Sequence, residues 1–137
     1  MFEKIIKQSK DNGLTAFEKI FCSGHYYDGK EQGYDYPVIV FTCDSETDGK
    51  TLAAWLYDVE KIVKRHKLIK RDSRFLPGHY YIAYTTMEHN DKATYAYGKA
   101  VCFQEGFFMA RYNNKNATEE ELIKAGHDSL VRHGYTV

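Results

Sequence analysis

The residues best suited to chemistry in this 137-residue chain are its cysteines and histidines. Cys22 and His25 stand three positions apart, and a predicted hairpin would bring Cys43 and Glu46 near them as zinc ligands. Structural zinc sites usually carry two tight ligand pairs, and no C-x-x-C pair occurs in the sequence. We therefore expect no metal, and we interpret the cysteines as small buried hydrophobic residues rather than ligands or a disulfide framework.

Two hydrolytic sites are also conceivable. Cys102 could act as a thiol nucleophile with His79 as its base, although the sequence marks neither an orienting group nor an oxyanion hole. In paired-histidine phosphodiester chemistry a small hydroxyl residue usually follows each histidine by two positions. This motif is absent, because the bulkier Tyr27 and Tyr81 stand at those positions after His25 and His79. Glycine-rich phosphate loops are absent from the sequence. We assign no catalytic residue, expect no cofactor, and keep a small histidine-dependent hydrolase only as an alternative.

Charge is segregated along a chain whose net charge is zero. Acidic residues dominate from 28 to 60, and basic residues dominate from 61 to 74. The basic segment fits the solvated end of a helix, where the helix dipole favours cations. It also fits a contact with an anion, so a nucleotide or nucleic-acid binding domain is our alternative function. The residues that would make this contact are Lys64, Arg65, Lys67, Lys70, Arg71 and Arg74.

Tyrosine is unusually common, with 12 residues, and several lie in segments that alternate like strands. We predict a hairpin of strands 79–87 and 94–103, with its turn at 89–92. This register places Tyr84 opposite Tyr97 and gathers bulky rings on one face of the ribbon. That aromatic face is a candidate binding surface, and its tyrosines are Tyr80, Tyr84, Tyr95 and Tyr97.

The opposite face of the predicted ribbon carries only small side chains, among them Ala83 and Ala96. Small residues let a helix backbone come close, so we expect the helix that contains Trp55 to pack there. The same register puts His79 beside Cys102. The aromatic face must then be covered by another helix, by a partner chain or by a ligand.

A mixture of helices and strands has to position these residues. The clearest helix has apolar side chains at i, i+3 and i+4 over residues 51–70, with Thr47 or Asp48 as its N-cap. Thr118 and Glu121 form a capping box that begins the last helix. We predict an α+β fold with a mostly antiparallel sheet of about five strands and packed helices, in the order α-β-β-α-β-β-β-α. The predicted helices are 2–10, 51–70 and 118–133, and the predicted strands are 15–27, 34–43, 79–87, 94–103 and 107–112. The apolar residues of 15–27 also fit a helical stripe, but their β-favouring content after Ile20 favours a strand.

Length and composition fit a single compact domain over residues 1–137. The N-terminus lacks the apolar run of a signal peptide and no stretch is long enough to span a bilayer, so we expect a cytoplasmic protein. Segregated charge on a neutral chain suits contact between two copies. Our leading interpretation is a non-catalytic binding protein that engages a protein partner or self-associates as a homodimer. Its size and lack of a catalytic motif are typical of small accessory or inhibitor proteins of phages and mobile elements.

Overall fold

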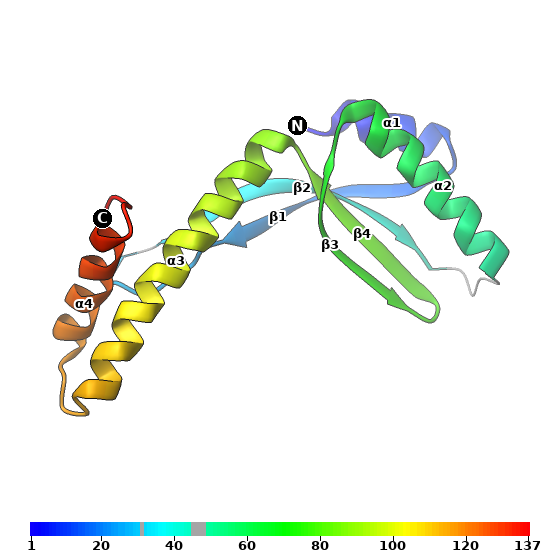
Figure 1. The fold of residues 1–137 in the computed structure, drawn as a ribbon. Coiled ribbons are helices and arrows are strands. Elements are labelled where there is room, and N and C mark those ends of the chain that lie inside the picture. Colours follow the sequence, from blue (N-terminus) through cyan, green and yellow to red (C-terminus); the bar gives the residue numbers. More distant parts are fainter. Residues whose placement is uncertain (31, 45–48) are drawn as a thin grey trace. The chain divides into compact units, whose positions relative to one another are not determined.

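The structure is a computed structural model that describes residues 1–30, 32–44 and 49–137. Figure 1 shows the described residues as an α+β fold of helices and an antiparallel sheet, which confirms the predicted class. The described part of the sheet has four strands in the order β1-β2-β4-β3, where about five were predicted. A helix, α3, occupies the position of the last predicted strands.

The elements follow one another along the chain as four helices and four strands among the described residues. The predicted N-cap at Thr47 or Asp48 and the candidate ligand Glu46 lie outside the described residues. The bounds are α1 Glu3–Asp11, β1 Thr15–Ser23, β2 Tyr34–Cys43, α2 Gly49–His66, β3 Ile69–Leu76, β4 His79–Thr85, α3 Met87–Asn113 and α4 Glu119–Arg132.

Residues 1–21 and 36–90 form one compact unit, which we call unit 1. Helices α1 and α2 lie on the same side of its sheet in Figure 1. α2 turns Trp55 and Val59 inward at helical spacing, so its amphipathic character is confirmed. The other buried members of this core are Phe2, Leu14, Ile39, Phe41, Ile62, Val63, Leu68, Ile82 and Tyr84.

The helix α2 ends four residues earlier than predicted, at His66. Lys67 adopts a left-handed backbone conformation with φ of 53°, which cannot continue the helix. Leu68 then enters the core, and the chain returns as β3, which pairs antiparallel with β4 at the edge of the sheet. β3 was not predicted because its residues are mostly polar, as an edge strand with exposed side chains permits.

Residues 22–35 and 91–137 form a second compact unit, which we call unit 2. Helices α3 and α4 approach closely at Gly106, where an added Cβ would lie 2.5 Å from the carbonyl oxygen of Ala125. The Ser129 hydroxyl donates to the carbonyl oxygen of Cys102 over 2.6 Å and links the same two helices. The capping box predicted at the start of α4 is confirmed. The single domain predicted over the whole chain stays a prediction.

The predicted strands 94–103 and 107–112 are wrong, because both segments lie within α3. The alternation of Tyr95 and Tyr97 favoured a strand, yet both are exposed residues of a helix. Gly106 allows α3 to pack closely on α4, and this tertiary packing overrides the local strand preference of the tyrosines. The buried residues of α3, at spacings of seven, three and three, are Ala93, Ala100, Phe103 and Gly106.

The register that paired Tyr84 with Tyr97 is therefore wrong as well. β4 pairs with β2 and β3 instead, and Tyr84 lies opposite Ile39 of β2. Tyr84 shares a core with Trp55, so the tryptophan helix packs on the bulky face of β4. The predicted packing of that helix on the small-residue face around Ala83 is wrong, since Ala83 points to the other side of the sheet.

Candidate functional site

The outward face of α3 in unit 2 is the first candidate surface. Four large side chains on it are exposed, by 64% for Tyr97, 43% for Val101, 53% for Phe108 and 82% for Tyr112. Their spacings of four, seven and four residues place them on one narrow face, because an α-helix turns once in about 3.6 residues. We call these four residues the α3 stripe.

The α3 stripe faces away from the contact of α3 with α4. The buried Phe103 and Gly106 lie nearly half a turn round the helix from Val101 and Phe108. Phe103 stacks on Tyr26 with ring centroids 4.3 Å apart. Apolar side chains therefore occur on both sides of α3. Exposed apolar side chains that gather on one face of a protein often mark an interaction site, which makes the stripe a candidate contact surface.

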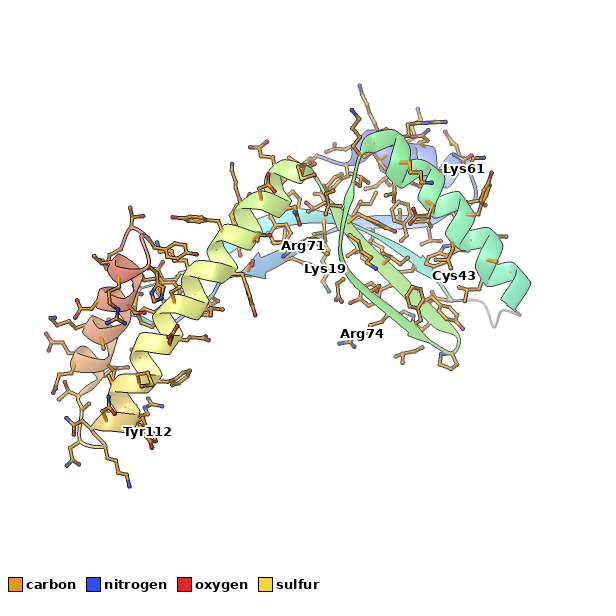
Figure 2. The ribbon with its side chains drawn as sticks, viewed as in Figure 1. Lys19, Cys43, Lys61, Arg71, Arg74 and Tyr112 are labelled. Atoms are coloured by element: carbon orange, nitrogen blue, oxygen red, sulfur yellow. The ribbon has the colours of Figure 1, made fainter. Side chains whose placement is uncertain are left out.

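The second candidate surface lies on the side of the unit 1 sheet opposite α1 and α2. Ile39 and Phe41 of β2 face the helices. Successive side chains of a strand alternate between its two faces, so Val40 and Thr42 face the other way and line the opposite side. A groove of about 400 Å³ lies on this side, and we call it the sheet groove. Figure 2 shows Lys19, Arg71 and Arg74 on this side of the sheet, away from Lys61 of α2. The charged and aromatic side chains that line the groove include Phe17, Lys19, Phe21, Arg74, His79 and Tyr81.

Hydrogen bonds occupy Asp72, a carboxylate in the groove lining. The Tyr81 hydroxyl donates to the Asp72 side chain, and the Ser73 amide donates to it over 2.8 Å. The bond to Asp72 raises the pKa of Tyr81 above its ordinary value, because it favours the protonated hydroxyl. Lys19 Nζ lies 6.0 Å from the centroid of the Phe21 ring, so a cation and a ring stand side by side in the groove.

Arg71 is held on the same side of the sheet by two hydrogen bonds. Its Nε donates to the Tyr36 hydroxyl over 3.0 Å, and one terminal nitrogen donates to Asn90 Oδ1 over 2.9 Å. The Tyr36 ring in turn contacts Phe21 edge-on, with centroids 6.2 Å apart. These contacts fix the Arg71 guanidinium close to the aromatic wall of the sheet groove.

The six basic residues predicted as one contact surface separate in the structure. Arg71 and Arg74 lie on the groove side of the sheet, as described above. Arg65 lines, with Lys61, a smaller pocket of about 200 Å³ beside α1. The remaining three are exposed at the end of α2 and the start of β3: Lys64, Lys67 and Lys70.

The four predicted tyrosines also separate, so the single aromatic face predicted for them is wrong. Tyr84 is buried, its hydroxyl donates to Glu60 over 3.3 Å, and burial raises its pKa. Tyr80 packs against the core of unit 1. Tyr95 and Tyr97 are exposed on α3. Only Tyr97 belongs to a surface that gathers several apolar side chains on one face.

The chemically active residues do not meet as the hairpin register predicted. That register placed His79 beside Cys102, and it does not exist because Cys102 lies in α3. His79 Nδ1 lies 2.7 Å from a carboxylate oxygen of Asp44. His25 Nδ1 lies 2.5 Å from the carbonyl oxygen of Gln32. Among the residues that the structure describes, no three His, Cys, Asp or Glu side chains gather as a metal site.

Several residues of both surfaces escaped the sequence analysis. Phe17, Lys19 and Phe21 alternate along a segment that was predicted as a strand, so their common face could have been read from the period of two. Val101, Phe108 and Tyr112 have helical spacing, which the strand interpretation of this segment concealed.

Comparison of the chain with protein-family models, with curated proteins and with solved structures finds no match. Of the helices in the described part of the chain, none combines the length and the apolar character needed to cross a bilayer.

Proposed function

We propose that this chain is a non-catalytic binding protein that self-associates, with the α3 stripe of one copy packed antiparallel on the stripe of a second copy. The observation that supports this proposal best is the self-complementary spacing of the stripe. A two-fold symmetric interface pairs residue i with residue j and residue j with residue i. The stripe satisfies this condition, because Tyr97 and Tyr112 are equidistant from a centre between residues 104 and 105, as are Val101 and Phe108.

In such a pair Tyr97 of one copy faces Tyr112 of the other, and Val101 faces Phe108. Each large residue then meets a large residue, so neither end of the stripe is left in water. Gln104 and Glu105 lie at the centre of the stripe and are both exposed. The amide of Gln104 would face the carboxylate of Glu105 in the second copy, and an amide can donate to a carboxylate.

Charge favours the antiparallel arrangement over a parallel one. A parallel pair of identical helices sets every residue beside its own copy. Glu105 would then face Glu105, and Arg111 would face Arg111, which is unfavourable in both cases. The antiparallel pair avoids these like-charge contacts and keeps the aromatic contacts.

The area available is adequate for association of moderate strength. Large side chains have roughly 150–250 Å² each, so the exposed fractions of the stripe amount to about 500 Å² per copy. Met109, which is 55% exposed, lies next to the stripe and would add to it. Stable interfaces bury about 800 Å² per partner, and smaller ones form transient complexes. We therefore expect a dissociation constant in the micromolar range.

Sedimentation velocity over a range of concentrations tests this proposal. Wild-type protein should change from monomer to dimer as the concentration rises to about 100 μM. Phe108→Lys places a charge opposite Val101 of the other copy and should keep the chain monomeric. The matched control is Val131→Lys, which changes a 63% exposed apolar residue of α4 and should leave the dimer intact. A monomeric wild type, or a dimer that Phe108→Lys does not weaken, would contradict the proposal.

A further inference from the structure

The sheet groove of unit 1 combines exposed cations with rings, and this combination points to a particular class of ligand. Lys19 and Arg74 are both exposed, and both line the groove. They come from β1 and β3, the two edge strands of the sheet. The cations therefore stand on opposite sides of a floor made by β2 and β4, which includes Val40 and Thr42.

Among the described residues, Asp72 in the groove and Asp44 beside His79 are engaged by neighbouring groups. Asp72 accepts from Tyr81 and from the Ser73 amide, and Asp44 lies 2.7 Å from His79 Nδ1. Lys19 and Arg74 line the groove together with Asp72, so the cations in its lining outnumber the carboxylate. An anion would gain from two cations on different strands, and the Asp72 carboxylate beside them already accepts hydrogen bonds from Tyr81 and the Ser73 amide.

Aromatic side chains lie between and beside these cations. Phe17 is 44% exposed although it is a large apolar residue, and Phe21 and Tyr81 line the same groove. Exposed rings next to Lys and Arg are the arrangement that binds single-stranded nucleic acid, because bases stack on rings while cations contact phosphates. A simple anion would need the cations and not the rings, whereas an apolar ligand would need the rings and not the cations.

We propose that the sheet groove is a binding site for single-stranded nucleic acid, with phosphates at Lys19 and Arg74 and a base stacked on Phe17. The groove volume of about 400 Å³ lies within the range of small-ligand sites, about 300–1,000 Å³, and so accommodates a single nucleotide unit. This assigns the nucleic-acid contact to β1 and β3 rather than to the basic end of α2. Of the six basic residues predicted from the sequence, Arg71 and Arg74 lie on this side of the sheet.

Fluorescence anisotropy with labelled 12-nucleotide strands of oligo(U) and oligo(dT) tests the site, and the two strands distinguish RNA from DNA. The double variant Lys19→Ala/Arg74→Ala should weaken binding at least tenfold. It should also reduce the slope of log Kd against log salt by about 1 to 2, because two phosphate contacts are lost. Phe17→Ala should weaken binding about tenfold at every salt concentration and leave the salt slope unchanged.

The matched control is Lys61→Ala/Arg65→Ala, which removes the same number of charges from the pocket beside α1. It should change the affinity less than twofold. If the control lost as much affinity as Lys19→Ala/Arg74→Ala, binding would depend only on the overall charge. That result would overturn the proposed binding site. Failure of wild-type protein to bind either strand at about 100 μM would overturn it as well. Circular dichroism of each variant distinguishes loss of a contact from loss of the fold. We expect the two double variants to stay folded, because all four substituted cations are exposed.

Discussion

Replacement of Gly106 by alanine tests the close packing of α3 on α4, which fixes the side of α3 that is buried. Alanine is a better helix former than glycine by about 1 kcal/mol, so the change would stabilise a helix that had free space beside it. At Gly106 the space is filled. The new Cβ would lie 2.5 Å from the carbonyl oxygen of Ala125 and 2.6 Å from Cβ of Ser129.

The cost follows from these two distances. Carbon atoms in favourable contact are about 3.5–4.0 Å apart, so α4 has to move away by roughly 1 Å. Such overpacking typically costs about 1–3 kcal/mol. The movement also strains the 2.6 Å hydrogen bond from Ser129 to the Cys102 carbonyl, worth about 1 kcal/mol. After subtraction of the propensity gain, Gly106→Ala should lower the free energy of unfolding by about 1–3 kcal/mol.

Urea unfolding followed by far-ultraviolet circular dichroism measures this loss, with Gly98→Ala as the matched control in the same helix. An added Cβ at Gly98 would meet only the Tyr135 side chain, whose hydroxyl oxygen lies 2.7 Å away at the far end of the side chain, which can shift. That variant should be as stable as wild type, or more stable by up to about 1 kcal/mol. A Gly106→Ala variant that equals wild type in stability would refute the close approach of the two helices.

Three further changes test other contacts. Burial raises the pKa of Tyr84, so above about pH 10 the folded protein keeps this proton while the unfolded chain releases it. The free energy of unfolding should therefore fall above about pH 10, and Tyr84→Phe should reduce this fall in urea unfolding at alkaline pH. Thr118→Ala removes the acceptor for the Glu121 amide at the start of α4 and should cost about 1 kcal/mol in thermal unfolding. Asp28→Asn removes the charge of a buried carboxylate that accepts from the Lys30 amide and the Gln32 side chain and lies 3.3 Å from His127 Nε2; hydrogen bonds to a charged group are the stronger ones, so we expect a loss of about 1–3 kcal/mol in urea unfolding.

The elements that could be predicted from the sequence are those whose residue patterns are local and do not depend on contact with another helix or strand. The inward residues of α2, such as Trp55 and Val59, repeat at i and i+4 over several turns. The capping box at Thr118 and Glu121 is a local hydrogen-bond pattern that marks the start of α4. Both are confirmed, because the local helix preference of these residues agrees with the helices they form in the fold.

The segment that became α3 could not be predicted in this way. The alternating Tyr95 and Tyr97 indicate a strand locally, and the small residues that permit contact with α4 become informative only when α4 is present. The wrong strand prediction for this segment also made the predicted aromatic face wrong, since the pairing of Tyr84 with Tyr97 depended on a hairpin. β3 was missed for a related reason, because an edge strand pairs with one neighbour and needs few apolar residues.

The arrangement of the two helices in the proposed dimer can be measured directly with single cysteines introduced into α3. Gln104 lies at the proposed two-fold axis, whereas two copies of Tyr112 would be separated by about 20 Å along an antiparallel pair, at a rise of about 1.5 Å per residue. A disulfide needs Cα atoms within about 7 Å. Under mild oxidation Gln104→Cys should therefore form a 104–104 linkage, identified by peptide mass spectrometry, and Tyr112→Cys should form no 112–112 linkage. A 112–112 linkage, or a yield from Gln104→Cys no greater than that of wild-type protein with its own three cysteines, would contradict the antiparallel dimer.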